Sequence, residues 1–349
     1  MIGLGADLLR WYTIHKRELP WRETKDPYAV WLSEVILQQT RIDQGLSYYL
    51  RFIEKYPTVH DLAGADEDEV LKLWQGLGYY SRARNLHAAA RTISSVFNGK
   101  FPDNYRELIK LKGVGEYTAA AISSISFNQP CAVVDGNVFR VLSRLYGITT
   151  PVNTQSGKKE FTRLANTVMD KENPGEYNQA IMEFGALYCT PKNPGCDSCM
   201  FNDRCVAFKN GSAGNLPVKT RTQKLRSRYF NYLIIRDHDH VYIRKRTGND
   251  IWRNLYEFPL IETEEKTKAN RLENHLVSFL GYENIEISEV TSWQKQLLSH
   301  QCIHYRFIYI RVNDKKFRLP YLLKVDKEDI LNFAVPKPIE KELDSIDWS

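Results

Sequence analysis

Four cysteines near the middle of the chain constrain the structure of their segment more than any other feature of the sequence. They are separated by six, two and five residues and are Cys189, Cys196, Cys199 and Cys205. Disulfides in secreted proteins are normally distributed along the chain, so thiols this close together predict a metal site. Structural zinc and a four-iron cluster fit the spacing equally well. Unliganded buried thiols are the plainer alternative, which the prolines and glycine of residues 191–195 disfavour.

Length and charge set the broad class of protein. The 349 residues are enough for two domains, each with a sizeable core. The net charge of +6 gives only weak support for a polyanionic partner. Residues 219–228 contain five basic residues and no acid; they either contact phosphates or form a solvated linker, and the linker is favoured. Because no stretch is apolar enough to span a bilayer, we expect a cytoplasmic protein in a reducing compartment.

The chain changes character after the cysteine segment. From Leu4 to Tyr188 apolar residues recur at helical spacing between short breaks, which predicts many short helices. Beyond the breaker-rich residues 210–217, aromatic and β-branched residues predict strands. The strands are expected at Tyr229–Ile235, Val241–Arg246 and His304–Val312, with a helix at Ala269–Leu280. We therefore expect an all-α domain over residues 1–211, a linker over 212–228 and an α+β domain over 229–349.

Glu34 lies in a segment, Tyr28–Gln39, that is apolar on nearly every side. Such a helix is buried, and burial raises the pKa of a carboxyl group so that it can donate a proton near neutral pH. An exposed glutamate, or one paired with an arginine, is an equally open reading of the pattern alone.

Asp135 follows an apolar run and precedes Gly136 and Asn137, where a new helix is expected to begin. Amide donors and the helix dipole would keep this carboxylate ionised, and a simple helix cap is the favoured reading of the residue by itself. Together, one protonated and one ionised carboxyl group suit the cleavage of a glycosidic bond.

Residues 111–120 contain two glycines, Gly113 and Gly115, in a turn between helical stretches. This segment resembles the helix-hairpin-helix motif, in which glycines let backbone amides approach a DNA phosphate without reading sequence. Taken alone, such a turn is only moderately specific. The residues predicted to contact DNA here are Gly113, Val114 and Gly115.

The order of the hairpin, Asp135 and the cysteine segment resembles the endonuclease III superfamily of DNA base-excision glycosylases, and within it the MutY family of adenine glycosylases. The similar segments cover essentially the first 210 residues and include residues 19–22, 33–40, 76–81 and 134–138. The resemblance implies a [4Fe-4S] cluster held by the four cysteines. It also implies a monomer that binds double-stranded DNA and is associated with the bacterial nucleoid through that DNA.

The same resemblance assigns catalytic roles. Adenine opposite 8-oxoguanine, or opposite guanine, would be flipped out of the duplex, and Glu34 would protonate its N7. Asp135 would stabilise the resulting sugar cation or trap it covalently. Glycosylases of the superfamily that also cut the strand have a lysine where this chain has Tyr117, and a phenol cannot form a Schiff base. Tyr117 therefore indicates a monofunctional enzyme.

Further residues match family positions around the flipped base and the lesion. Those expected to line the adenine site are Trp21, Arg22, Leu37, Asn137 and Gln179. Those expected to enter the DNA gap are Gln39, Thr40 and Tyr79. Without the resemblance, they would be read as core, helix-end and loop residues.

The second half resembles a Nudix-like domain through residues 252–259. Because residues 260–281 lack the glutamate-rich helix that would hold magnesium, pyrophosphate hydrolysis is not expected, and the domain is expected to read 8-oxoguanine. Ser299 and His300 match a loop of the family that meets the lesion, while Leu298 replaces a phenylalanine there. On pattern alone they are polar loop residues.

Three rival functions differ in their chemistry. One is a bifunctional glycosylase-lyase of the same fold, against which Tyr117 argues. Another is a non-catalytic iron-sulfur protein that binds DNA or senses redox state. The third is a nucleotide pyrophosphatase that acts through the second half.

Overall fold

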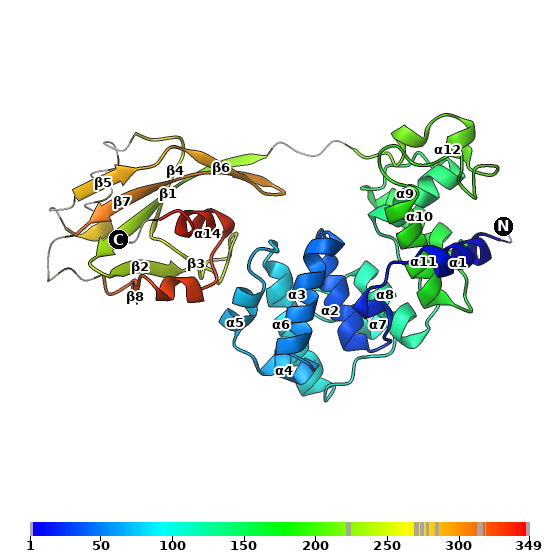
Figure 1. Cartoon of the computed structure of the whole chain (residues 1–349), viewed down its shortest axis with the longest axis horizontal. Helices are drawn as coiled ribbons and strands as arrows, with labels where there is room; N and C mark the ends of the chain where they lie inside the picture. The colour runs from blue at the N-terminus through cyan, green and yellow to red at the C-terminus, as the bar shows by residue number, and fades with distance from the viewer. Residues whose placement is uncertain are drawn as a thin grey trace. The chain divides into compact units, whose positions relative to one another are not determined.

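The computed structural model describes residues 3–220, 225–268, 272, 276, 279–282, 286–312, 317 and 319–346. Its contacts group the chain into two compact units (Figure 1). The first comprises Met1–Gly64 and Asn85–Arg221, and the second comprises Ala65–Arg84 and Thr222–Ser349. Residues 65–84 thus group with the second half of the chain, which the sequence did not suggest. The domain boundaries expected from the sequence stay a prediction.

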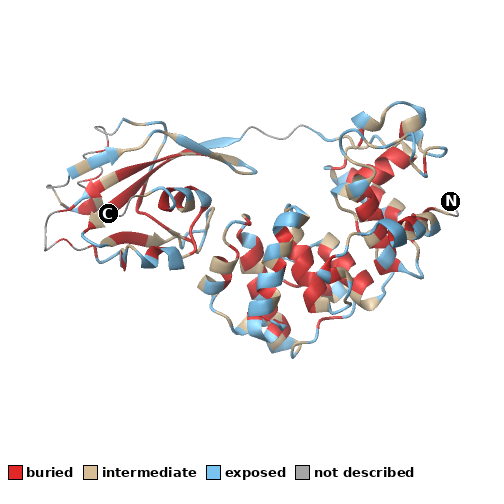
Figure 2. Ribbon diagram, in the orientation of Figure 1, coloured by how far each residue is buried: buried red, intermediate tan, exposed pale blue. Residues whose placement is uncertain are grey.

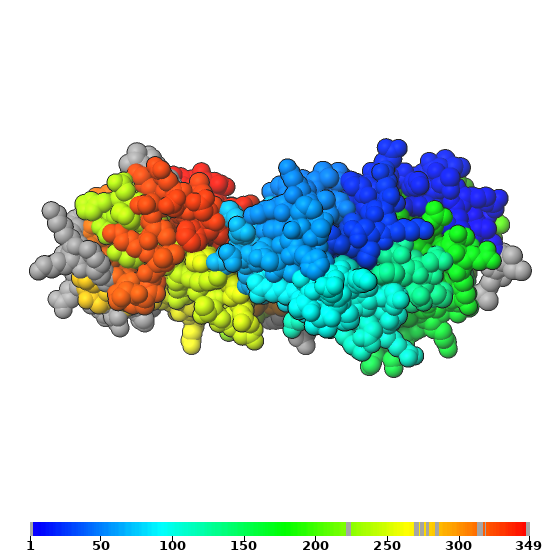
Figure 3. Space-filling view, turned by 90° about the horizontal axis from the view of Figure 1, so that it is seen from below, coloured from blue at the N-terminus to red at the C-terminus, as the bar shows by residue number. Residues whose placement is uncertain are grey.

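All elements described in the first unit are helices, as predicted. In chain order they are α1 (Leu4–His15), η1 (Pro20–Arg22), α2 (Pro27–Leu37), α3 (Ile42–Lys55), α4 (Val59–Gly64), most of α6 (Ser81–Val96), α7 (Tyr105–Leu108), α8 (Glu116–Phe127), α9 (Gly136–Tyr146), α10 (Gln155–Val168), α11 (Pro174–Leu187), α12 (Val206–Lys209) and η2 (Ala213–Asn215). Helix α1 packs on α11, and Figure 3 shows the blue N-terminal residues bordering a green segment far along the chain. Among the described helices, none combines the length and the apolar character needed to cross a bilayer.

Helix α2 is buried along almost its whole length (Figure 2). The Asp26 carboxylate caps its N-terminus by accepting hydrogen bonds from the backbone N–H groups of Tyr28 at 3.2 Å and Ala29 at 3.4 Å. Pro27 occupies the first helical position, where the missing N–H costs no hydrogen bond. Because its residues are apolar on every side, the helix packs against both α3 and α8. It forms the centre of this unit.

The second unit contains a mixed sheet, as predicted for an α+β domain. Its strands are β1 (Arg226–Asp237), β2 (His240–Lys245), β3 (Tyr256–Glu257), β4 (Leu260–Thr263), β5 (Glu286–Val290), β6 (Gln294–Leu297), β7 (Gln301–Arg311) and β8 (Leu323–Asp326). Its helices are α5 (Glu67–Leu73), η4 (Asp329–Asn332) and α14 (Lys337–Leu343). The three strands expected from the sequence are confirmed. The helix expected at 269–280 lies largely outside the described residues.

Strands β1 and β7 are parallel neighbours at the centre of this sheet. Their side chains alternate between two cores: Tyr232 and Ile234 face one, and Leu233 and Ile235 face the other. Helix α14 covers the first face, where Ile339 joins the same core (Figure 1). Burial on both faces explains the unbroken apolar run of residues 232–235 in the middle of β1.

Glu257 is a fully buried carboxylate in this unit. Arg244 and Arg246 reach it at 2.9 Å and 2.8 Å, and none of the Glu257 side chain is exposed. A buried carboxylate with two guanidinium partners is well satisfied. Removing its charge takes the carboxylate partner from Arg244 and leaves Arg246 paired with Asp250.

We expect Glu257→Gln to destabilise the second domain by about 3–5 kcal/mol. Urea unfolding followed by tryptophan fluorescence measures the change. Asp239→Asn is the matched control, because Asp239 is 77% exposed and its ion pair with Lys327 is worth less than about 1 kcal/mol. Equal midpoints for the two variants would contradict the structural role of Glu257.

Candidate active site

A cavity of about 190 Å³ opens in the first unit between the end of η1, α2, the start of α8 and α11. Its volume is several times the roughly 30 Å³ that one water occupies in the liquid. The structure brings to it all the residues predicted for catalysis and base binding: Glu34, Tyr117, Asp135, Trp21, Arg22, Leu37, Asn137 and Gln179. Their assigned roles remain predictions.

Glu34 projects from α2 into this cavity and is only 8% exposed. Burial raises its pKa to about 7, with a smaller contribution from the charge of Asp135; the Tyr117 hydrogen bond and the charge of Arg22 act in the opposite direction. The Tyr117 hydroxyl donates to Glu34 Oε2 at 2.6 Å. The alternative of an exposed glutamate is therefore wrong. Near neutral pH, this carboxyl group is protonated in a large fraction of molecules and can donate its proton.

Asp135 caps α9, as predicted, and it also lines the cavity; its catalytic role stays a prediction. Its Oδ1 accepts from the Val138 backbone N–H at 2.8 Å, and its Oδ2 accepts from Asn137 Nδ2 at 2.9 Å. Burial nevertheless raises its pKa, although these hydrogen bonds and the charge of Arg140 lower it. The sequence did not show how deeply the aspartate lies, so it did not predict this upward shift of the pKa; that Asp135 acts as a carboxylate stays a prediction.

Arg140 connects this corner of the cavity to the cysteine segment. Its Nη2 donates to Asn137 Oδ1 at 2.8 Å and to the Gly185 carbonyl at 2.6 Å. Its Nε donates to the Cys189 carbonyl at 2.7 Å. One guanidinium thus fixes the partner of Asp135 and the first residue of the cysteine cluster together.

The four predicted metal ligands, Cys189, Cys196, Cys199 and Cys205, line one small cavity of about 30 Å³. Arg144 Nη1 lies 3.4 Å from Cys189 Sγ, and the Phe201 backbone N–H donates to Cys199 Sγ at 3.4 Å. Across the part of the chain that the structure describes, no three His, Cys, Asp or Glu side chains form a group that could hold a single metal ion.

Sequence reasoning missed two charged residues of the catalytic cavity, Arg17 and Glu183. Glu183 projects from α11 and its side chain is 1% exposed. A glutamate within an otherwise apolar helical stretch was the signal that pointed to Glu34, and residues 180–187 carry the same signal. Tyr12 was missed as well; its hydroxyl donates to Gln179 Oε1 at 2.6 Å.

The predicted hairpin lies just before α8. Gly113 has a φ of 76°, and a Cβ added to it would lie 2.5 Å from the Cβ of Asn85, so only glycine fits there. Val114 is 5% exposed and anchors the turn, while Gly115 stands at the N-terminus of α8. The contact of this turn with a DNA phosphate stays a prediction.

Two of the three residues predicted to enter the DNA gap are exposed and have a strained backbone. Gln39 and Tyr79 have φ values of 57° and 48°, which non-glycine residues adopt at a cost of about 1–3 kcal/mol. Thr40 lines the catalytic cavity. Within the second unit, the Tyr79 hydroxyl lies 2.9 Å from Ser299 Oγ, and His300 beside it is exposed. Two predicted lesion contacts thus lie together.

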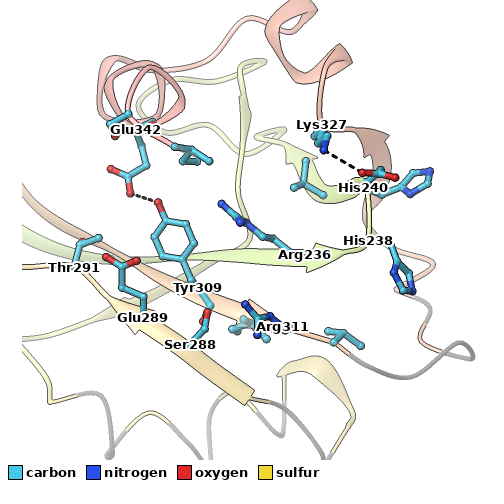
Figure 4. Close-up of a pocket in the computed structure, with 16 residues that line it drawn as sticks. Arg236, His238, His240, Ser288, Glu289, Thr291, Tyr309, Arg311, Lys327 and Glu342 are labelled. Atoms are coloured by element: carbon cyan, nitrogen blue, oxygen red, sulfur yellow. Dashed lines mark hydrogen bonds and ion pairs between the residues drawn. The ribbon is translucent and has the colours of Figure 1, made fainter. Parts of the chain in front are cut away.

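A larger groove of about 970 Å³ in the second unit carries none of the predicted site residues (Figure 4). Two of its three acids are engaged: Glu342 accepts from the Tyr309 hydroxyl at 2.7 Å, and Asp239 pairs with Lys327 at 3.1 Å. It lacks the pair of carboxyl groups in a small enclosed space that distinguishes the first cavity.

Two family models match the chain. The HhH-GPD superfamily of base excision DNA repair proteins matches residues 32–167, and the NUDIX domain matches residues 231–345. The adenine DNA glycosylase of Buchnera aphidicola subsp. Schizaphis graminum is 34% identical over 349 residues, which are 97% of this chain and 96% of that protein. The chain belongs to the adenine DNA glycosylase family. The human adenine DNA glycosylase is 44% identical over 211 residues, covering 58% of this chain and 39% of that protein.

Solved structures share the fold of the matched part of the chain. A thermostable thymine-DNA glycosylase is 29% identical with a TM-score of 0.55, and the match covers 59% of this chain and 94% of that one. Endonuclease III in a non-covalent DNA complex is 26% identical with a TM-score of 0.51, over the same shares of the two chains. The predicted helix-hairpin-helix fold with a Nudix-like second domain is confirmed.

We expect Tyr117→Phe to raise the pKa of Glu34 above about 7, because it removes the hydrogen bond that favours the carboxylate. The pKa is measurable from the carboxyl carbon of isotope-labelled glutamate by NMR. Tyr28→Phe is the matched control: it deletes a buried hydrogen bond to the Tyr56 carbonyl and leaves the carboxyl group untouched. A Glu34 pKa that falls, or that moves equally in both variants, would contradict the contact.

Proposed function

We propose that this protein is a monofunctional adenine DNA glycosylase of base excision repair, which hydrolyses the N-glycosidic bond of adenine opposite 8-oxoguanine or guanine in duplex DNA. One observation carries the proposal. Glu34, with a pKa near 7, shares an enclosed cavity with the second carboxyl group of Asp135. Family membership supplies the substrate class, since the curated relatives are adenine DNA glycosylases.

The chemistry follows from the two carboxyl groups. A base that is flipped into the cavity takes the Glu34 proton at N7, which turns a poor anionic leaving group into a neutral one. The sugar that remains carries positive charge, and the Asp135 carboxylate stabilises it electrostatically or by a short-lived covalent bond. Asn137 and the Val138 N–H hold that carboxylate in place. Water then completes the hydrolysis.

Tyr117 supports a glycosylase without lyase activity. Strand cleavage by this superfamily needs a lysine amine to attack the sugar and form a Schiff base. The group at this position is a phenol, and burial raises its pKa well above its ordinary value, so it stays neutral and keeps its proton on the Glu34 hydrogen bond. The product is then an intact strand with an abasic site.

Reading of 8-oxoguanine is assigned to residues outside the catalytic cavity. Tyr79, Ser299 and His300 lie on exposed segments of the second unit, and the first two are already in hydrogen-bond contact. Gln39 and Thr40 follow α2 directly, so they lie next to the acid that they would serve. The hairpin glycines supply sequence-independent grip on the phosphates.

We also propose a [4Fe-4S] cluster on Cys189, Cys196, Cys199 and Cys205. Four thiols around one cavity, with a guanidinium at Cys189 and an N–H donor at Cys199, fit a negatively charged sulfur-rich group. The choice of four irons over one zinc rests on the resemblance to the endonuclease III superfamily, since both groups take four thiolates. Such a cluster would order the loop for contact with DNA. The cytoplasmic location, the monomeric state and the association with the nucleoid are part of the same proposal.

We expect Glu34→Gln to reduce adenine excision by at least about 10²-fold, because an amide cannot supply the proton, while duplex binding is retained. Single-turnover assays on duplexes with adenine opposite 8-oxoguanine measure excision, with and without alkali. Glu107→Gln is the matched control, since Glu107 is an exposed partner of Lys110. Full turnover by Glu34→Gln would sink the proposed role.

The same assay separates the rival functions. A monofunctional glycosylase yields nicked strands only after alkali, whereas a lyase nicks without it and is trapped on DNA by borohydride. Binding without adenine release identifies a non-catalytic DNA-binding protein. Magnesium-dependent hydrolysis of 8-oxo-dGTP identifies a pyrophosphatase.

We expect Cys199→Ser to lose the iron and acid-labile sulfide of the purified protein and to weaken duplex binding, since a serine hydroxyl is a poor ligand for iron. Elemental analysis and visible absorption measure the loss. Cys131→Ser is the control, because Cys131 lies outside the cysteine segment. Zinc in place of iron, or equal loss in both variants, would refute the cluster.

A further inference from the structure

The wall of the catalytic cavity on α11 holds an unusual group of charges. Glu183 accepts five hydrogen bonds: from Arg17 N at 3.0 Å, Nε at 2.8 Å and Nη2 at 2.6 Å, and from Arg22 Nη1 at 2.9 Å and Nη2 at 2.7 Å. Both arginines therefore meet one carboxylate in a two-pronged arrangement, which is the strongest geometry for this pair of groups. All three residues line the cavity that contains Glu34.

The two arginines keep the Glu183 carboxylate ionised. Burial by itself would raise the pKa of Glu183, but the hydrogen bonds and charges of Arg17 and Arg22 outweigh it and hold that pKa at about 2. The group of three therefore carries one net positive charge at every pH at which the protein works. Without the Glu183 carboxylate, the two arginines would bring two positive charges to the cavity that is proposed to bind a neutral base.

Most of the Arg22 guanidinium is in contact with other side chains or backbone groups. Its Nη1 hydrogens are used by Glu183 and by the Arg17 carbonyl at 3.0 Å, and its guanidinium lies over the Tyr12 ring at 5.6 Å. Its Nε–H and one Nη2–H have no acceptor among the residues that the structure describes. A purine offers ring-nitrogen acceptors to such donors.

We propose that Glu183 is a positioning residue for base excision: it fixes the orientation of Arg22 in the cavity wall and cancels one of the two positive charges that the arginines bring there. Because the role assumes that Glu34 protonates a purine, it rests on the proposed function. Uncancelled positive charge near Glu34 favours its carboxylate, and a carboxylate cannot protonate the base.

The groups that face Glu34 come from each element packed around it. They are Tyr117 of α8, Asp135 at the N-terminus of α9 and Arg22 of η1. Asp43 of α3 acts on Arg17 instead. Arg22 is the member of the arginine group whose charge acts on Glu34, and Glu183 holds that guanidinium in place through two hydrogen bonds.

A ladder of variants tests this role. Glu183→Gln leaves two positive charges, the wild type and the double variant Arg17→Gln/Glu183→Gln leave one, and Arg17→Gln leaves none. The rate of excision falls as pH rises through the pKa of Glu34, since only the protonated acid acts. We expect this fall at lower pH in Glu183→Gln, at the wild-type pH in the double variant and at higher pH in Arg17→Gln, by about half to one pH unit per charge.

The measurement is single-turnover excision from pH 5 to 9, paired with NMR titration of labelled Glu34 in the free protein. A merely structural role predicts lower active fractions with no ordered movement of the pH midpoint, and that result overturns the proposal. Should Glu183→Gln not fold, Arg17→Gln and the double variant still decide it. Wild-type protein that releases no adenine refutes the proposed function, whereas the Glu34 titration still tests Glu183.

Glu183→Asp supplies the conservative comparison. It keeps the charge but shortens the side chain, so both arginines cannot keep their two-pronged contacts. We expect the pH midpoint to stay at its wild-type position while the plateau rate falls several-fold, which separates the charge of Glu183 from its reach. A pH midpoint that moves as far in Glu183→Asp as in Glu183→Gln contradicts the charge argument.

Discussion

The hydrogen bond between Glu34 and Tyr117 is the contact on which the candidate site depends. Helix α2 buries Glu34 because the residues around it are apolar on every side, and an ionised carboxylate in such a place is costly unless donors surround it. Its hydrogen-bond partner comes from α8, 83 residues later in the chain, at 2.6 Å. One donor satisfies the carboxyl group without fixing its charge, which leaves the proton available.

The cavity contains three carboxyl groups that differ in how many donors they meet. Glu183 accepts from two guanidinium groups and stays ionised with a pKa of about 2. Glu34 meets one neutral hydroxyl, and its pKa rises to about 7. At Asp135, burial raises the pKa, while the hydrogen bonds from Val138 and Asn137 and the charge of Arg140 lower it. The number and charge of the hydrogen-bond donors, together with burial, therefore set the pKa of each of the three carboxyl groups.

Sequence patterns predicted the features that depend on local order. The cap at Asp135, the two-glycine turn and the apolar α2 each depend on residues within a few positions, so their elements could be placed. The pairings across the cavity could not. Tyr12 meets Gln179 from 167 positions away, and Arg17 meets Glu183 from 166. Periodicity shows that a helix has a polar residue on a buried face, but not which distant residue satisfies it.

The same limit explains the grouping of residues 65–84 with the second half of the chain. Their sequence continues the helical pattern of the first half, and nothing in it marks a change of unit. In the structure, Asp68 of α5 pairs with Lys245 and accepts from the Tyr256 hydroxyl at 2.9 Å, while Tyr80 donates to the Val335 carbonyl at 3.2 Å. Contacts of this kind between segments far apart in sequence leave no periodic signal.

Helix α8 joins two functions that the sequence presents as separate. Gly115 of the hairpin caps its start, and Tyr117 follows in its first turn. If the proposed function holds, a DNA phosphate bound by the amides of the turn would also fix the phenol that hydrogen-bonds Glu34, because both belong to the start of one helix. Helix α8 would then set both the contact with the DNA backbone and the position of the hydrogen bond to Glu34. A duplex that is displaced by one phosphate would leave the acid without a base to protonate, which restricts chemistry to a correctly seated substrate.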